Sequence, residues 1–410
     1  MTEFFDDLET RAPEVRERAQ FAALGRQIAN AKANTPRLAE SLAGVEPGDV
    51  ADRAALARLP VIRKSELMDL QRANPPFGGL TAVADGALGR ILQSPGPIYE
   101  PEGGRGDFWR MERAMFAAGF RAGDVAHNTF SYHLTPGGLM MDAGCRALGC
   151  AVIPAGVGQT EQQVEAIAHI RPNAYVGTPS FLRILLDKLV EAGVAIPFRK
   201  AMVGGEALPP SLRGEFEARG VAVRQNYGTA DLGLIAYETP ALEGMVIDEG
   251  VIVEIVRPGT GDPVAEGEVG EVVVTTLTPE YPLIRFATGD MSAVMAGASP
   301  CGRTNTRIKG WMGRADQTTK VKGMFVHPGQ VNQVVKQHPQ VARARLVVDN
   351  PDNTDVMTLR CESGEGGAAL AEAIAATIQS VCKVRGLVEF VPPGTLPNDG
   401  KVIDDLRKFE

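Results

Sequence analysis

The sequence predicts an α/β protein with a large N-terminal domain, which combines parallel sheets with an antiparallel lobe, and a small mobile α+β C-terminal domain. Three observations support this. The chain has 410 residues, 44% of them hydrophobic, which exceeds what one core usually supports. Helical and apolar segments alternate from residue 107, and period-two strands follow residue 245. A polar stretch after Arg314 divides the chain into residues 1–314 and 315–410.

Composition limits the classes of function. The 42 basic and 50 acidic residues give a net charge of -8, and no basic run is present that would follow a nucleic acid. The N-terminus is acidic and lacks the pattern of a leader, and no long apolar stretch predicts a membrane span. Five scattered cysteines without a CxxC pair suit reduced thiols. We therefore expect a cytoplasmic protein that binds neither nucleic acid nor a membrane.

The elements of the large domain follow from periodicity and from capping residues. The first ninety residues look helical and irregular, with a helix over 14–33. Thr178 and Pro179 begin a helix whose apolar residues recur at spacings of three and four. The other predicted segments are helices at 108–120, 161–170 and 210–219, and strands at 151–153, 174–176, 201–203 and 221–223. Strands and helices that alternate in this way predict a parallel sheet.

Two loops follow predicted strands of this sheet. Gly204-Gly205-Glu206 follows strand 201–203, and the run Asn226 to Asp231 follows strand 221–223. Ligands of open parallel sheets bind beyond the carboxyl ends of the strands, so both loops could line one site. In the second run, Gly228 admits a close ligand, Tyr227 can stack on a base, Thr229 can bond a phosphate and Asp231 can hold Mg²⁺. Ordinary turns would also give these short runs.

A second carboxylate follows the antiparallel strands at 251–256 and 271–276. The run Arg285 to Asp290 places Asp290 after a glycine, where it could accept hydrogen bonds from two ribose hydroxyls. A solvated Asp in a Gly-Asp turn is the alternative.

The C-terminal domain is predicted as a small α+β sandwich. Its expected elements are helices at 328–337 and 367–382, strands at 342–348, 356–361 and 387–391, and a turn at 349–353. A Gly-containing loop, 396–401, then carries Lys401. A lysine on a movable domain could neutralise charge that develops on a phosphate or carboxylate oxygen, whereas a solvated tail lysine is the plainer interpretation.

The order and spacing of these motifs resemble the adenylate-forming superfamily, and most closely its phenylacetate-CoA ligase family, over nearly the whole chain. The matching segments are 204–208, 226–231, 285–290, 313–329 and 396–401. The resemblance implies that ATP and a carboxylic acid form an acyl-adenylate, and that CoA then attacks the acyl carbon. It implies adenine contacts at Gly204, Gly205, Glu206, Asn226 and Tyr227, phosphate contact at Thr229, Mg²⁺ near Asp231, ribose at Asp290, ribose or phosphate at Arg314, a hinge at Asp316 and the adenylation lysine at Lys401.

The sequence departs from the family pattern at the phosphate loop. Residues 93–101 contain three prolines and no lysine, so backbone binding of the triphosphate should be weaker, although Ser94 and Gly96 could retain part of that role. Asp231 stands where the family usually has Glu. Only Cys301 remains of a Cys/His cluster that could hold zinc in many relatives, so we expect no structural zinc.

The resemblance places the acyl pocket at Tyr132, His133, Pro136, Pro179 and Ala230, whose flat and apolar surfaces suit an aryl or arylacetic acid. His133 could orient a polar group on the acid or be a partly buried structural histidine. Two other functions stay open: transfer to an acceptor other than CoA, such as an amine, a carrier protein or a deazaflavin, and non-catalytic binding of a nucleotide or acyl group. A homodimer is common among similar enzymes.

Overall fold

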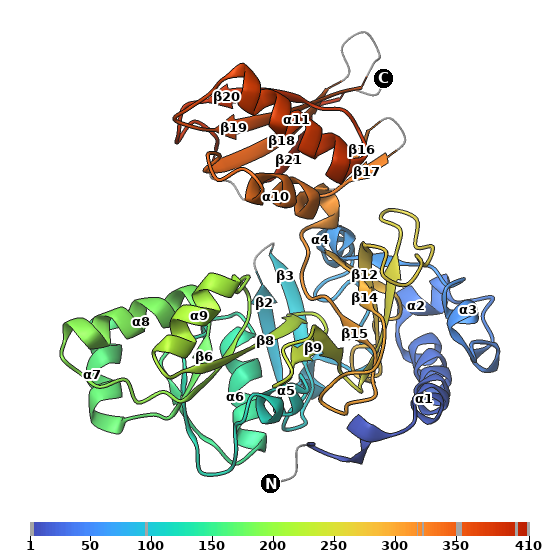
Figure 1. The fold of residues 1–410 in the computed structure, drawn as a ribbon. Helices are drawn as coiled ribbons and strands as arrows, with labels where there is room; N and C mark the ends of the chain where they lie inside the picture. The colour runs from blue at the N-terminus through green and yellow to red at the C-terminus, as the bar shows by residue number, and fades with distance from the viewer. Residues whose placement is uncertain are drawn as a thin grey trace. The chain divides into compact units, whose positions relative to one another are not determined.

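The computed structural model describes residues 4–94, 97–317, 319–321, 324–349, 355–397 and 401–407. Two compact units make up the chain. The first comprises residues 1–288 and 293–311, and the second comprises residues 289–292 and 312–410. The predicted fold class is confirmed: a large unit rich in parallel strands accompanies a small α+β unit (Figure 1). The mobility of the small unit stays a prediction.

A nine-stranded mixed sheet is the centre of the first unit. Its parallel half has the spatial order β5 (Ala151–Pro154), β4 (Val125–Asn128), β6 (Ala174–Gly177), β7 (Lys200–Val203) and β8 (Ala222–Thr229). Its antiparallel half continues through β9 (Gly233–Glu238), β10 (Met245–Ile247), β15 (Arg307–Ile308) and β14 (Val294–Met295). The sheet therefore changes from parallel to antiparallel pairing at β8.

Helices accompany the parallel half: α5 (Met111–Ala117), α6 (Gly137–Ala147), α7 (Thr160–Ile170), α8 (Pro179–Glu191) and α9 (Pro210–Ala218). Figure 1 shows α7, α8 and α9 beside β6 and β8. Helix α8 begins as its sequence predicts, because the hydroxyl of Thr178 accepts a hydrogen bond from Phe181 N at 3.3 Å. Its leucines at positions 182, 185, 186 and 189 are fully buried. The periodicity of α8 therefore marked its core-facing side correctly.

A second sheet has the order β1 (Ile62–Arg63), β13 (Phe286–Ser292), β12 (Gly270–Thr276) and β11 (Val251–Val256). The N-terminal segment contributes α1 (Pro13–Asn34), α2 (Pro36–Ser41), α3 (Arg53–Leu56), α4 (Leu67–Ala73) and the short 3-10 turns η1 (Asp7–Thr10), η2 (Pro47–Asp49), η3 (Lys64–Glu66) and η4 (Asp85–Ala87). Buried residues of α1, β11 and β12 form one hydrophobic cluster, so this segment covers the second sheet.

Three local expectations are corrected. The strand predicted at 221–223 continues to Thr229, because β9 supplies an antiparallel partner for the run that starts at Asn226. The helix predicted at 108–120 is limited to α5. The segment at 93–101, expected as a loop, forms a hairpin of β2 (Arg90–Ser94) and β3 (Ile98–Glu102). Each correction depends on pairing or packing between segments, which local patterns do not report.

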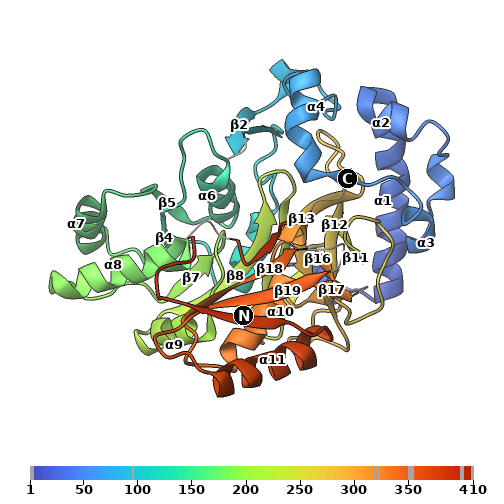
Figure 2. The same cartoon turned by 90° about the horizontal axis from the view of Figure 1, so that it is seen from above.

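The second unit contains a four-stranded sheet of order β20 (Leu387–Val391), β19 (Val356–Glu362), β18 (Arg343–Asp349) and β21 (Ile403–Asp405). Its remaining elements are η5 (Ala315–Gln317), the hairpin β16 (Thr319–Val321) and β17 (Met324–Val326), and the helices α10 (Pro328–Lys336) and α11 (Ala368–Cys382). Figure 2 shows α10 and α11 along β18 and β19. The predicted turn at 349–353 lies outside the described residues apart from Asp349. No helix among the described residues is both long and apolar enough to cross a membrane.

Candidate active site

The Gly204 loop and the last residues of strand β8 meet at the carboxyl edge of the parallel strands. Gly204 N donates to Gly177 O at 3.2 Å, and Asn226 Nδ2 donates to Val203 O at 3.2 Å. A Cβ atom on Gly204 would come within 2.9 Å of the Asn226 amide, so a larger residue here would displace that side chain. The structure therefore brings two of the predicted nucleotide-binding segments together.

Glu206 ties the first loop to the start of α8. Its carboxylate accepts from Ser180 Oγ at 2.9 Å and from Ser180 N at 3.3 Å, and the side chain is exposed. Gly205 has φ of +76°, which glycine adopts without strain. Pro179, a predicted pocket residue, is buried at the first turn of the same helix. These predicted residues lie on adjoining segments.

The residues at the end of β8 are more buried than the motif suggested. Tyr227 is only 8% exposed and its hydroxyl donates to Thr288 Oγ1 at 3.3 Å, so its ring lies in the core rather than open to a base. Gly228 lies at a register shift, where a Cβ atom would come within 2.6 Å of Gly233 O. Thr229 and Ala230 are half-buried, and Thr229 Oγ1 accepts from Leu232 N at 3.2 Å. The hydroxyl of Thr229 can still donate to a ligand oxygen.

Asp231 has a partner that no sequence motif indicated. Its Oδ2 lies 2.6 Å from the ammonium of Lys64, which is carried on η3 after the edge strand β1. Lys64 is isolated from every predicted motif, and its contact spans 167 residues of sequence. Only the tertiary structure reveals this pair.

Ser94 ends β2, and both its backbone N–H and its hydroxyl donate to the carboxylate of Glu100 on β3, the N–H at 3.0 Å. Glu100 is fully buried. Burial, reinforced by the negative charge of Asp231, raises the pKa of Glu100 to about 8. Sequence reasoning missed Glu100. Pro95 and Gly96, which belong to the predicted phosphate loop, lie outside the described residues.

The hairpin lies against the predicted acyl-pocket segment, because Gln93 N donates to Leu134 O at 2.8 Å. Tyr132 is half-buried, and its hydroxyl accepts from Asn128 Nδ2 at 2.7 Å and donates to Asp142 Oδ2 at 3.2 Å. Pro136 is buried at the start of α6. His133 is exposed, so the interpretation as a partly buried histidine is wrong.

In the second unit, Asp290 and Arg314 form a pair. Arg314 Nη1 lies 3.1 Å from Asp290 Oδ1, and the two residues also form an isolated antiparallel bridge. Gly289 has φ of +75°, and a Cβ atom there would meet the Arg314 guanidinium at 2.7 Å. The structure thus places both predicted ribose residues side by side. Asp290 lies within strand β13, not in a solvated turn.

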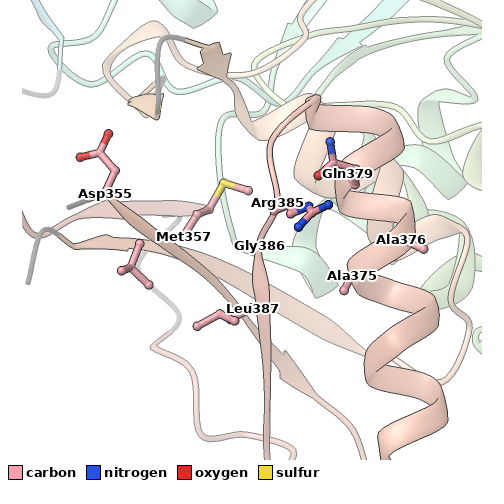
Figure 3. A pocket seen from close by; sticks show the side chains of 9 residues that line it. Asp355, Met357, Ala375, Ala376, Gln379, Arg385, Gly386 and Leu387 are labelled. Atoms are coloured by element: carbon pink, nitrogen blue, oxygen red, sulfur yellow. The ribbon is translucent and has the colours of Figure 1, made fainter.

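Two further predicted residues belong to the second unit. Asp316 lies in η5, and Lys401 precedes β21 with its side chain 59% exposed and its ammonium 3.7 Å from Asp404 Oδ1. Asn398 to Gly400, the middle of the predicted lysine loop, lie outside the described residues. A pocket of about 570 Å³ in this unit lies between α11 and β20 (Figure 3), and Met357, Gln379 and Arg385 are among its lining residues. Its lining includes none of the predicted site residues.

Comparison with protein families adds to this geometry. The model for AMP-binding enzymes matches residues 109–278, and the model for the AMP-binding enzyme C-terminal domain matches residues 323–406. These two matches define an AMP-binding enzyme. Phenylacetate-coenzyme A ligase of Thermus thermophilus is 31% identical over 407 residues, which cover 89% of this chain and 90% of the relative. The Escherichia coli enzyme of the same name is 29% identical, and the alignment covers 98% of each chain.

The chain belongs to the phenylacetate-CoA ligase family of AMP-forming acid–CoA ligases. Solved structures agree in fold. An open conformation of 2-hydroxyisobutyryl-CoA ligase, in complex with 2-HIB-AMP and CoA, has a TM-score of 0.86 at 24% identity and covers 98% of this chain and 95% of that one. The same ligase in its thioesterification state has a TM-score of 0.72.

Proposed function

We propose that the protein activates an aryl or arylacetic acid with ATP, forms the acyl-adenylate with release of pyrophosphate, and transfers the acyl group to CoA. The observation that carries this proposal is the hydrogen bond from Asn226 to Val203, next to Gly204. It brings two predicted nucleotide-binding segments together at the carboxyl edge of the sheet. The names of the relatives, phenylacetate-coenzyme A ligases, support the class of acid and the use of CoA.

Adenylation solves the problem that a carboxylate has no good leaving group. The phosphate ester that forms leaves easily, so the protein mainly positions the reactants and neutralises charge. In this proposal, Gly204 to Glu206 and Asn226 bind adenine, and Thr229 binds a phosphate oxygen. Asp290 accepts from the ribose hydroxyls while Arg314 orients the Asp290 carboxylate. Tyr227, which the structure buries, supports the loop from the core.

The acyl pocket suits a flat ring. Because the hydroxyl of Tyr132 is already bonded to Asn128 and Asp142, this residue presents its ring rather than a free hydroxyl to the acid. Pro136, Pro179 and Ala230 contribute small apolar surfaces. His133 is exposed and gives the mouth of the pocket a polar group.

The second unit supplies Lys401, which we assign to the adenylation step. Its exposed ammonium can neutralise charge on the phosphate as the bond forms. Rotation of the C-terminal domain about a hinge at Asp316 would then withdraw Lys401 and admit CoA. Mg²⁺ would accompany the phosphates of ATP. The cytoplasmic location and a homodimer stay predictions.

One experiment tests the function. Purified protein is incubated with ATP, Mg²⁺ and a panel of aryl, arylacetic and short aliphatic acids, with and without CoA. Pyrophosphate release and hydroxamate formation report adenylation, and thioester absorbance reports transfer. Pyrophosphate and AMP with an arylacetic acid, and a thioester only when CoA is present, would support the proposal. Adenylation without a thioester would indicate another acceptor, and ATP binding without turnover across the panel would indicate a binding protein.

A further inference from the structure

A charged cluster lies beneath the end of β8. The ammonium of Lys64 lies 2.6 Å from Asp231 Oδ2, and the side chains of Lys64 and Asp231 are 25% and 0% exposed. Lys64 is carried on η3, directly after the edge strand β1. An ion pair at this distance with one partner removed from solvent is strongly coupled, because water screens it little.

The surroundings of Asp231 do not suit a hydrated metal ion. Its second oxygen, Oδ1, is buried and has no hydrogen-bond partner in the described part of the chain. Mg²⁺ requires near-octahedral oxygen ligands and usually keeps several of its waters. A carboxylate that offers one oxygen to an ammonium and keeps the other away from solvent does not provide such a ligand. The predicted Mg²⁺ role of Asp231 therefore conflicts with the geometry around this residue.

A second carboxylate completes the cluster. Glu100 is fully buried, interacts electrostatically with both Asp231 and Lys64, and accepts hydrogen bonds from the backbone and hydroxyl of Ser94. The hydroxyl of Tyr281 is also buried and has no hydrogen-bond partner in the described segments. Lys64, a quarter exposed, is thus a cation beside two acidic groups that are themselves buried.

We propose that the ammonium of Lys64 is the built-in cation of this loop and occupies the position that the sequence assigns to Mg²⁺ at Asp231. Lys64 holds the Asp231 side chain in place without a divalent ion. Through Asp231 it also holds the turn that follows Thr229. A metal then enters the site only on the phosphates of ATP. The inference concerns charge in the nucleotide-free protein and does not depend on which acid is activated.

The test measures binding of Mn²⁺, used as a probe of the metal position, to the full-length protein without nucleotide. Electron paramagnetic resonance counts the bound ions in wild type, Lys64→Ala and Arg63→Ala. Arg63 is a matched control, because it adjoins Lys64, pairs with Glu271 at 3.1 Å and is 26% exposed. We expect Lys64→Ala to gain one site at least ~10-fold tighter than any site in the other two proteins. Adding Asp231→Asn to Lys64→Ala should remove the gained site.

Lys64→Ala leaves a buried carboxylate without its cation and could prevent folding. Asp231→Asn alone supplies a second measurement, since the proposal expects its Mn²⁺ titration to match that of wild type. A wild-type site lost in Asp231→Asn would overturn the proposal. A folded Lys64→Ala protein that binds Mn²⁺ no more tightly than wild type would also overturn it. Because no acid or ATP is present, failure here is distinguishable from failure in the acid panel.

Discussion

At the residue scale, Lys401 carries the largest share of the proposed chemistry. Its side chain is 59% exposed, and Asp404, at 3.7 Å, is too distant for a strong hydrogen bond. An ammonium at such an exposed position is open to an incoming phosphate, and surface ion pairs of this kind contribute little to stability. Exposure of this kind suits a group that acts on a ligand rather than one that stabilises the fold.

We expect Lys401→Ala to lower adenylate formation by about 10²- to 10³-fold, because one stabilising charge on the developing phosphate ester is lost. Thioester formation from preformed acyl-adenylate and CoA should change little. Pyrophosphate release and single-turnover transfer assays separate the two steps. Lys336→Ala, which removes a lysine from the last turn of α10, is the control. Adenylation at the wild-type rate in Lys401→Ala would show that this assignment is wrong.

At the element scale, the hairpin β2–β3 replaces the loop that the sequence suggested. The register pairs Ser94 with Ile98, and Glu100 on β3 satisfies the donors of Ser94. Donors that could bind a phosphate are thus engaged by a carboxylate of the protein itself.

The raised pKa of Glu100 predicts a pH dependence of stability. Burial, with the charge of Asp231, holds the folded pKa near 8, against an ordinary value of 4.5. Between these values the native state binds more protons than the unfolded chain, so the free energy of unfolding should fall as pH rises from about 4.5 to about 8. Glu100→Gln should flatten this slope in urea titrations at several pH values, whereas Glu66→Gln, at an exposed position, should not. Identical slopes in Glu100→Gln and wild type would refute the prediction.

Helix α6 depends on one of its two leading glycines. A Cβ atom on Gly138 would lie 2.7 Å from Ser131 O and 2.8 Å from the Tyr132 ring, whereas one on Gly137 meets nothing closer than 3.6 Å. Gly138→Ala should therefore cost about 1–3 kcal/mol of unfolding free energy and raise the KM for the acid by displacing Tyr132. Gly137→Ala should be neutral or slightly stabilising. Denaturant titrations and steady-state kinetics compare the two, and equal behaviour would contradict the packing argument.

At the scale of the whole molecule, the five cysteines are free thiols, and all except Cys301 are buried. Burial raises the pKa of Cys150, Cys361 and Cys382 to about 11. Burial also acts on Cys301, but hydrogen bonds from Ser299 and Thr239 bring its pKa below the ordinary value. Thiol reactivity should thus concentrate at one position.

A thiol reagent should therefore modify one cysteine rapidly in the native protein and all five after denaturation. Cys301→Ser should abolish the rapid phase and lower the number of cysteines modified in the denatured protein from five to four. Absorbance of the released chromophore gives the stoichiometry. Rapid modification of two or more thiols per native molecule would contradict the prediction, because it would show that a second cysteine is accessible.

The sequence by itself determined the elements whose signals are local. The caps and periodicity of α8, the alternation that produced β6, β7 and α7, and the period-two strands β11 and β12 all follow from neighbouring residues. The motif order also identified the family, since homologous sites keep their order along the chain. The placement of Asn226 beside Gly204 followed from the rule for carboxyl ends of parallel strands.

Only the tertiary structure decided which charges face one another. It buried Tyr227, took Asp290 into a strand beside Arg314, and gave Asp231 the partner Lys64. Such pairs join segments far apart in sequence, and their strength depends on burial, which no residue pattern records. The sequence therefore determined the kind of enzyme, while the folded chain decided that Asp231 of the predicted nucleotide site pairs with Lys64.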